Sequence, residues 1–185
     1  MRHPVAIFSL FCVLLFSGCS KLETENSIPE VIQAGELDIQ GSLPEFSRPM
    51  LRGGTLTSNS LSGKITLINF WATWCGPCVV EIPEFVALKK EWIDRPFEIV
   101  GVSLDETGFE AVMPFADDFY LNYPQILDLD GALGDGLGGI FALPATFVID
   151  ERGAIVKSYL GVFPMEVMRA ELDKWISKIE GKSGV

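Results

Sequence analysis

The feature that most restricts the fold of this 185-residue chain is a pair of cysteines, Cys75 and Cys78, placed between a strand and a helix. Residues 65–71 form a short, mostly apolar run rich in β-forming residues, which is typical of a strand buried in the middle of a sheet. From Pro77 onward the apolar residues recur at helical spacing, and proline is well tolerated in the first turn of a helix. The sequence therefore predicts a strand that leads directly into a helix, with the two thiols at the junction.

The rest of the chain alternates between strand and helix patterns. Further strands are predicted at residues 97–104, 124–127, 146–150 and 154–160, and further helices at residues 107–118 and from Pro164 onward. Thr107 and Glu110 have the spacing of a capping box at the start of the first of these helices. Residues 151–153 have the composition of a hairpin turn between the last two strands. Together these patterns predict an α/β fold with a central mixed sheet flanked by helices.

The N-terminal segment has the composition of an export signal. A short basic stretch precedes an apolar run at residues 4–16, which is shorter than the roughly 20 residues that span a bilayer. Small residues directly before Cys19 resemble the lipobox of bacterial lipoproteins, although Phe16 stands where that motif prefers leucine. We expect a signal peptide at residues 1–18, a lipidated Cys19 and a membrane-anchored lipoprotein on the periplasmic side of the cell envelope. The alternative is an ordinary signal peptide with Cys19 as a bystander.

The segment after the signal is polar and acidic, with few aromatic residues. We expect residues 19–42 to form a tether between the membrane and a folded domain at residues 43–185. Residues 31–32 and 37–39 could instead form an added strand. The net charge of −11 argues against nucleic acid as a partner.

The cysteine and histidine content narrows the chemistry of the mature protein. Of four cysteines, Cys12 leaves with the signal and Cys19 is expected to carry lipid, so Cys75 and Cys78 are the remaining thiols. The single histidine, His3, also leaves with the signal, which excludes a Cys–His hydrolase and a His-containing zinc site. An exported compartment is oxidising, and so close a pair closes too small a loop to stabilise the fold much. We therefore predict a redox-active disulfide that works without a metal or a cofactor.

Thiol–disulfide exchange requires a thiolate, and a free cysteine is mostly protonated at neutral pH. The start of a helix favours the anion through its unpaired N–H groups and its dipole. We expect Cys75 to be the more exposed nucleophile and Cys78 to be the buried thiol that resolves the mixed disulfide. Trp74 is expected to shield one side of the site, the alternative being plain packing.

Residues 71–78 resemble the thioredoxin superfamily, and specifically its exported TlpA/ResA/CcmG-like branch. The motifs that carry this resemblance are Trp71-Ala-Thr-Trp-Cys-Gly-Pro-Cys78, Gly63-Lys64, Asp128-Leu-Asp-Gly131 and Pro144-Ala-Thr-Phe-Val-Ile-Asp150. The resemblance implies a thioredoxin-like fold with an N-terminal hairpin and a central insertion. It also implies that Pro144 is a cis-proline facing the dithiol and that Leu143 offers its backbone to a substrate. Gly76 and Pro77 would border the same substrate site.

Two positions bear on the proton of the resolving cysteine. Cytosolic thioredoxins carry a buried aspartate where this chain has Asn69, which cannot titrate. ResA-like proteins carry a glutamate three residues after the second cysteine, and Glu81 occupies that position. A partly buried carboxylate with a raised pKa could relay the proton. The alternative is that Glu81 is a solvated helix residue.

The resemblance implies an exported thiol–disulfide oxidoreductase that reduces protein disulfides, with apocytochrome c as a candidate substrate. Its electrons would come from a membrane thiol transporter of the CcdA or DsbD type, and we expect it to be a monomer. The alternatives are a peroxiredoxin-like thiol peroxidase, a disulfide isomerase and a binding module. Ala72 argues against the peroxidase, because those enzymes carry threonine three residues before the reactive cysteine.

An acidic cluster further along the chain hints at calcium. Asp128, Asp130 and Asp135 are close in sequence, but they lack the alternating ligands and the terminal glutamate of an EF-hand loop. We therefore expect a turn at this place rather than a metal site.

Overall fold

The computed structural model describes residues 35–183, so the predicted signal peptide, Cys19 and the first part of the tether lie outside the described residues. The strands are β1 (Gly35–Leu37), β2 (Ser47–Pro49), β3 (Thr55–Thr57), β4 (Ile65–Trp71), β5 (Phe97–Ser103), β6 (Gln125–Leu127), β7 (Ala145–Ile149) and β8 (Ile155–Leu160). The helices are α1 (Gly76–Glu91), α2 (Phe109–Asp118), α3 (Ala132–Gly136) and α4 (Met165–Ser183), with a short 3-10 turn, η1 (Ser58–Leu61). Within this part of the chain, no helix is long and apolar enough to cross a membrane.

The main sheet is mixed, as predicted, with the strand order β1-β8-β7-β4-β5-β6. Strand β4 runs parallel to β5 and antiparallel to β7, while β7 and β8 form the predicted hairpin. Every residue of β4 is buried, because the strand has a neighbour on each side and packed layers on both faces. The predicted N-terminal hairpin is present as the antiparallel pair of β2 and β3.

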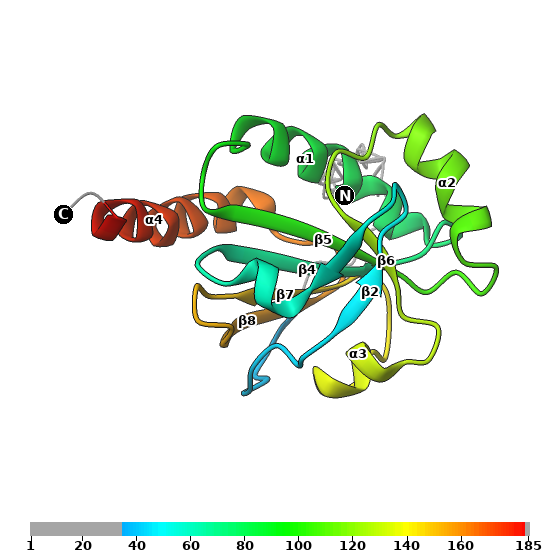
Figure 1. Cartoon of the computed structure of the whole chain (residues 1–185), viewed down its shortest axis with the longest axis horizontal. Helices are drawn as coiled ribbons and strands as arrows, with labels where there is room; N and C mark the ends of the chain where they lie inside the picture. Colours follow the sequence, from blue (N-terminus) through cyan, green and yellow to red (C-terminus); the bar gives the residue numbers. More distant parts are fainter. Residues whose placement is uncertain (1–34, 184–185) are drawn as a thin grey trace, which may run out of the picture.

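Helices cover both faces of the sheet, and a separate apolar cluster fills each side (Figure 1). Side chains of β4 alternate between the two clusters, since successive residues of a strand point to opposite faces. Leu67 and Trp71 belong to the cluster beneath α1 and α4, whereas Ile68 and Phe70 belong to the one beneath α3. This alternation places Asn69, midway between Leu67 and Trp71, on the face that α1 covers.

The folded part begins earlier than the predicted boundary at residue 43. Strand β1 pairs with β8, with Gly35 opposite Leu160, and the Leu43 N–H donates to the Gly153 carbonyl at 2.8 Å. Residues 35–42, which we predicted to lie in the tether, are therefore attached to the sheet. The alternative of an added strand at residues 37–39 overlaps β1 at Leu37 alone, and residues 31–32 lie outside the described residues.

The capping box predicted at Thr107 is wrong. Helix α2 begins at Phe109, and its N-cap is Gly108, which makes no side-chain capping bond. Gly108 has φ 64° and ψ −138°, a conformation that residues with a Cβ rarely adopt. The chain enters this helix through a glycine turn, so the side chain of Thr107 stands one position too early to cap it.

Candidate active site

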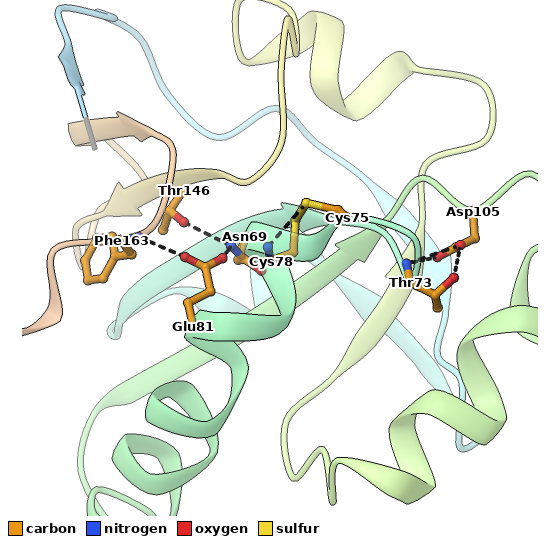
Figure 2. The surroundings of a disulfide bond; sticks show 8 residues. All are labelled: Asn69, Thr73, Cys75, Cys78, Glu81, Asp105, Thr146 and Phe163. Carbon is orange, nitrogen blue, oxygen red and sulfur yellow. Dashed lines mark hydrogen bonds between the residues drawn. A yellow bond between two sulfur atoms is a disulfide. The ribbon is translucent and has the colours of Figure 1, made fainter. Parts of the chain in front are cut away.

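The two cysteines form a disulfide where β4 leads into α1 (Figure 2). Cys75 is the N-cap residue of α1, and its sulfur accepts a hydrogen bond of 3.3 Å from the Cys78 N–H. Pro77 lies in the first turn, where its missing N–H costs the helix nothing. After reduction, the same N–H and the positive end of the helix dipole can stabilise a thiolate on Cys75.

As predicted, Cys75 is more exposed than Cys78. Cys78 is fully buried, while Cys75 is 5% exposed and lines an open groove. The groove is lined by Trp74, Cys75, Gly76 and Pro77 on the α1 side, and by Leu104, Ile140, Phe141, Ala142 and Leu143 on the other. Cys75 is therefore the cysteine that faces the groove, and Cys78 lies behind it in the interior.

Two aromatic side chains stand at this groove with most of their surface in solvent. Trp74 is 70% exposed, so it does not serve as core packing, and Phe141 is 85% exposed. Trp74 was predictable from the motif around the cysteines. Phe141 was not predicted as a site residue, because it lies 63 positions after Cys78 and outside the motifs. Exposed aromatic residues beside a reactive group are a suitable surface for binding an apolar segment of another protein.

The predicted cis-proline is present. The peptide bond between Leu143 and Pro144 is cis, and Leu143 lines the groove beside Cys75. The carbonyl of Pro144 accepts a hydrogen bond of 2.9 Å from the Gly161 N–H, which ties this loop to the end of β8. The loop opposite the disulfide is therefore held by the sheet.

Glu81 lies on α1 with its carboxylate in the protein interior (Figure 2). Glu81 is 2% exposed, so the alternative of a solvated glutamate is wrong. Oε1 accepts a hydrogen bond of 2.7 Å from Nδ2 of Asn69, and Oε2 accepts one of 2.8 Å from the N–H of Phe163.

The environment of Glu81 raises the pKa of its carboxyl group towards neutral pH. Burial raises the pKa of Glu81 to about 7, the hydrogen bonds from Phe163 and Asn69 oppose this rise, and the nearby Glu84 adds to it. A carboxyl with this pKa can accept or release a proton at physiological pH, as a general acid–base group must.

Asn69 is the partner that joins Glu81 to the sheet. Its Nδ2 also donates to Oγ1 of Thr146 on β7 at 3.0 Å, so one amide connects α1, β4 and β7 (Figure 2). The sequence singled out Asn69 and Glu81 separately and did not predict their contact. The alternation of β4 was the available signal, because it places Asn69 under α1.

Asp105, which the sequence analysis missed, holds the loop in front of the disulfide. Its carboxylate accepts hydrogen bonds from the Thr73 N–H at 3.0 Å and from the Thr73 hydroxyl at 2.6 Å (Figure 2). It also accepts one from the Ser103 hydroxyl at 2.8 Å. Asp105 is buried, and within residues 35–183 no lysine or arginine forms an ion pair with it. The available signal was its place after β5, since parallel neighbours β4 and β5 end at the same edge of the sheet.

Two of the three aspartates in the acidic cluster, Asp128 and Asp130, have protein partners. Asp128 accepts hydrogen bonds from the backbone N–H groups of Leu133 and Gly134, and Arg48 forms ion pairs with Asp128 and Asp130. These contacts confirm the predicted turn, which leads into α3. No group of three potential ligands that could hold a metal ion is present among the described side chains.

The disulfide at the start of α1 opens into a groove on a thioredoxin-like sheet, and this combination defines a thiol–disulfide oxidoreductase of the thioredoxin class. The chain belongs to the Redoxin family, which it matches over residues 39–176. This membership confirms the resemblance that the sequence motifs gave.

Similar proteins carry the same activity in their names. The chain is 34% identical over 174 residues to the thiol:disulfide interchange protein DsbE of Pseudomonas fluorescens biotype C, covering 93% of this chain and 90% of that protein. It is 31% identical over 179 residues to the thiol-disulfide oxidoreductase ResA of Bacillus thuringiensis, covering 97% and 99%. Among solved structures, a thiol:disulfide interchange protein of Chlorobium tepidum superposes with a TM-score of 0.67 at 30% identity, covering 74% of this chain and 97% of that one.

Proposed function

We propose that this protein reduces disulfide bonds of other proteins outside the cytoplasm, with Cys75 as the nucleophile, Cys78 as the resolving thiol and Glu81 as the proton acceptor. The observation that carries the proposal is the buried carboxylate of Glu81, one turn beyond Cys78 on the helix that presents the disulfide. The residues Gly76 and Pro77 between the cysteines support the reducing direction, since the same pair occurs in thioredoxins.

In the first step, the reduced protein attacks the substrate. The Cys75 thiolate forms a bond to one sulfur of the substrate disulfide, and the other substrate sulfur leaves as a thiolate. The capping N–H of Cys78 and the N-terminus of α1 stabilise the attacking thiolate before this step. The product is a mixed disulfide between Cys75 and the substrate.

In the second step, Cys78 resolves the mixed disulfide. Its thiol gives a proton to the Glu81 carboxylate, and the resulting thiolate attacks the Cys75 sulfur. The bond between Cys75 and the substrate breaks, and the second substrate sulfur leaves as a thiolate. The substrate has gained two electrons, the protein ends as the Cys75–Cys78 disulfide, and the proton on Glu81 passes to a departing thiolate.

The groove beside Cys75 is the proposed place for the substrate segment. Trp74 and Phe141 offer apolar surface on its two sides, Gly76 and Pro77 border it, and Leu143 offers its backbone next to the cis bond. An extended segment that carries a cysteine and apolar neighbours fits this chemistry.

The export signal and the lipobox predicted from the sequence set the proposed cellular location. Cys19 would carry a lipid that anchors a monomer on the periplasmic side of the envelope membrane. A membrane thiol transporter of the CcdA or DsbD type would supply electrons to the disulfide, and apocytochrome c is the candidate substrate. The names of the relatives ResA and DsbE support the exchange chemistry. No bound cofactor is required, because both electrons are stored in the dithiol.

Trapping tests the exchange step and names the substrate. The variant Cys78→Ser should accumulate mixed disulfides through Cys75 in cells, and mass spectrometry should identify the captured protein. The matched control is the double variant with Cys75→Ser as well, which should capture nothing. Absence of any captured protein from Cys78→Ser would contradict the proposal.

The direction of electron flow needs a separate measurement. Alkylation of the wild type in rapidly acidified cells should show the Cys75–Cys78 pair mainly as dithiol, and a fully oxidised pair would contradict the reducing direction. Peroxide consumption by the reduced protein would favour the peroxidase alternative. Thr73, the threonine nearest to Cys75, gives that alternative no support, since its hydroxyl donates to Asp105.

A further inference from the structure

The side-chain amide of Asn69 is buried, and its nitrogen makes two hydrogen bonds while its oxygen makes none. Nδ2 donates to Oε1 of Glu81 and to Oγ1 of Thr146, whereas Oδ1 has no hydrogen-bond partner. Buried polar atoms are nearly always bonded, so an orphaned acceptor beside a titratable group needs a physical reason.

Protonation of Glu81 creates a conflict in this arrangement. Both carboxylate oxygens face a hydrogen-bond donor, with Asn69 Nδ2 at Oε1 and the Phe163 N–H at Oε2. A carboxylic acid needs an acceptor for its own O–H group. The backbone N–H of Phe163 can only donate, so it cannot accept the new O–H group. The side-chain amide of Asn69 carries an oxygen, Oδ1, which has no hydrogen-bond partner and could accept it.

We propose that Asn69 is a positioning residue whose side-chain amide makes a half turn each time Glu81 gains or loses a proton. With Glu81 ionised, Nδ2 donates to Oε1 and to Thr146 Oγ1. With Glu81 protonated, Oδ1 occupies that place and accepts from the O–H on Oε1 and from the Thr146 hydroxyl. Each state has two hydrogen bonds to the amide and leaves one amide group unbonded, so the turn costs no hydrogen bond.

The turn also selects the oxygen that carries the proton. Since the Phe163 N–H bonds Oε2 in both states, the proton resides on Oε1, the oxygen that faces β4. This inference rests on the proposed role of Glu81: the proton that leaves Cys78 would be received at Oε1 and held there by Asn69. Without the turn, the protonated state would place two donors against each other.

The other groups around Glu81 do not offer the missing acceptor. Glu84, on the same helix, and Tyr123, which precedes β6, act on Glu81 through charge and are not among the hydrogen-bond partners of its carboxylate, which are Asn69 and Phe163. Burial and the Glu81 charge raise the pKa of Tyr123, so it stays neutral. Cys75 and Cys78 do not titrate while they form the disulfide. Burial brings the pKa of Glu81 to about 7, so both orientations of the amide are accessible near neutral pH.

Nuclear magnetic resonance on the oxidised full-length protein tests the turn without substrate or electron donor. With side-chain amides labelled, the Nδ2 protons of Asn69 should show nuclear Overhauser effects to the γ-protons of Glu81 and to the β-proton of Thr146 at pH 9. These effects should be lost at pH 5, with a midpoint near pH 7. Persistence of both effects at pH 5 would overturn the proposal.

The variant Glu81→Gln provides a matched control. The Phe163 N–H should hold the Gln oxygen, so that the Gln N–H group faces Asn69 and fixes its amide in the turned orientation at every pH. The nuclear Overhauser effect between the Nδ2 protons of Asn69 and the β-proton of Thr146 should then be absent at pH 5 and at pH 9. Its presence at either pH would overturn the proposal. If this variant does not fold, the pH series of the wild type still decides. Neither readout requires thiol–disulfide exchange, so a failure of the proposed reductase function would leave this test intact.

Discussion

Nδ2 of Asn69 and Oε1 of Glu81 lie 2.7 Å apart in the protein interior, one on β4 and the other on α1. The carboxylate that we propose to accept the proton therefore comes from the helix that carries the cysteines, and the strand supplies an amide. The position at which thioredoxins carry an aspartate is thus used to bond a carboxylate rather than to provide one. This exchange of roles makes Glu81 the buried acid whose titration has measurable consequences.

The first consequence is a pH-dependent stability. In the unfolded chain Glu81 titrates near its ordinary pKa of about 4.5, and in the folded protein its pKa is about 7. The folded state therefore binds the proton more tightly, and this stabilisation is complete below pH 4.5 and is lost as the pH rises to 7. The contribution of Glu81 to the free energy of unfolding should fall by about 3 kcal/mol over this range.

Urea unfolding of the oxidised protein at several pH values measures this effect. Because other carboxylates also titrate, the informative quantity is the difference between the wild type and Glu81→Gln, which cannot ionise. The wild type should lose stability relative to the variant between pH 4.5 and 7. Parallel curves for the two proteins would contradict a raised pKa of Glu81.

The second prediction concerns Asp105, which holds Thr73 two residues before Cys75. Asp105→Ala leaves the Thr73 N–H and the Thr73 and Ser103 hydroxyls without their buried acceptor, which should cost about 1–3 kcal/mol of stability. The Thr73 amide should exchange its hydrogen faster, and thiol–disulfide exchange should slow because the loop no longer fixes Cys75.

A matched control is available on the surface. Asp117 pairs with Arg52 in an ion pair that is largely exposed, so Asp117→Ala should change stability by less than about 1 kcal/mol. Equal effects of the two substitutions would show that the bonds of Asp105 do not order the loop.

The third prediction concerns the exposed aromatic residues of the groove. Trp74→Ala and Phe141→Ala should each raise KM for a protein disulfide about 10-fold, since each removes apolar contact area from the proposed substrate surface. Rates with a small disulfide such as oxidised glutathione should change much less. Tyr120 is also exposed but is not part of the groove, so it provides the control. Tyr120→Ala should change neither the KM for the protein disulfide nor the rate with the small disulfide. Loss of rate with the small disulfide as large as that with the protein would argue against a binding role.

The sequence predicted the strands of the main sheet well because the central ones are continuous apolar runs bounded by turn residues. The predicted range of β4 at residues 65–71 is the observed one, and the predicted hairpin of β7 and β8 is correct to within a residue at each end. The active-site cysteines and Pro144 were predictable because their chemistry is local to a short motif. Strand β1 was harder to predict, since three mostly exposed residues carry almost no periodic signal.

The parts of the site that were missed depend on contacts between distant segments. Asp105 follows β5 and bonds a loop 32 positions earlier, and no local pattern distinguishes it from a surface aspartate. The bonds of Glu81 to Asn69 and Phe163 join α1 to β4 and to the segment after β8, so the burial that raises its pKa follows only from the packed structure. The failed capping box at Thr107 has the opposite origin, because a local motif was present but the turn at Gly108 set the start of the helix.

The last prediction tests the packing beneath the site at Gly101 on β5. A Cβ at this position would lie 2.1 Å from Oε1 of Gln125, the same oxygen that accepts a hydrogen bond of 3.0 Å from Nε1 of Trp71. Gly101→Ala should therefore displace the Gln125 side chain and leave the buried indole N–H unbonded, at a cost of about 1–3 kcal/mol by urea unfolding.

A double-mutant cycle separates this mechanism from an effect of alanine on the strand itself. Gln125→Ala already removes the acceptor of Trp71, so adding Gly101→Ala to it should cost little more, and the two single effects should sum to more than the effect of the double variant. Gly181, near the end of α4, has no atom within 4 Å of its ideal Cβ, and Gly181→Ala should be neutral or stabilising by less than about 1 kcal/mol. Additive losses at Gly101 and Gln125 would show instead that the glycine is needed for the strand backbone and not for the contact with Gln125.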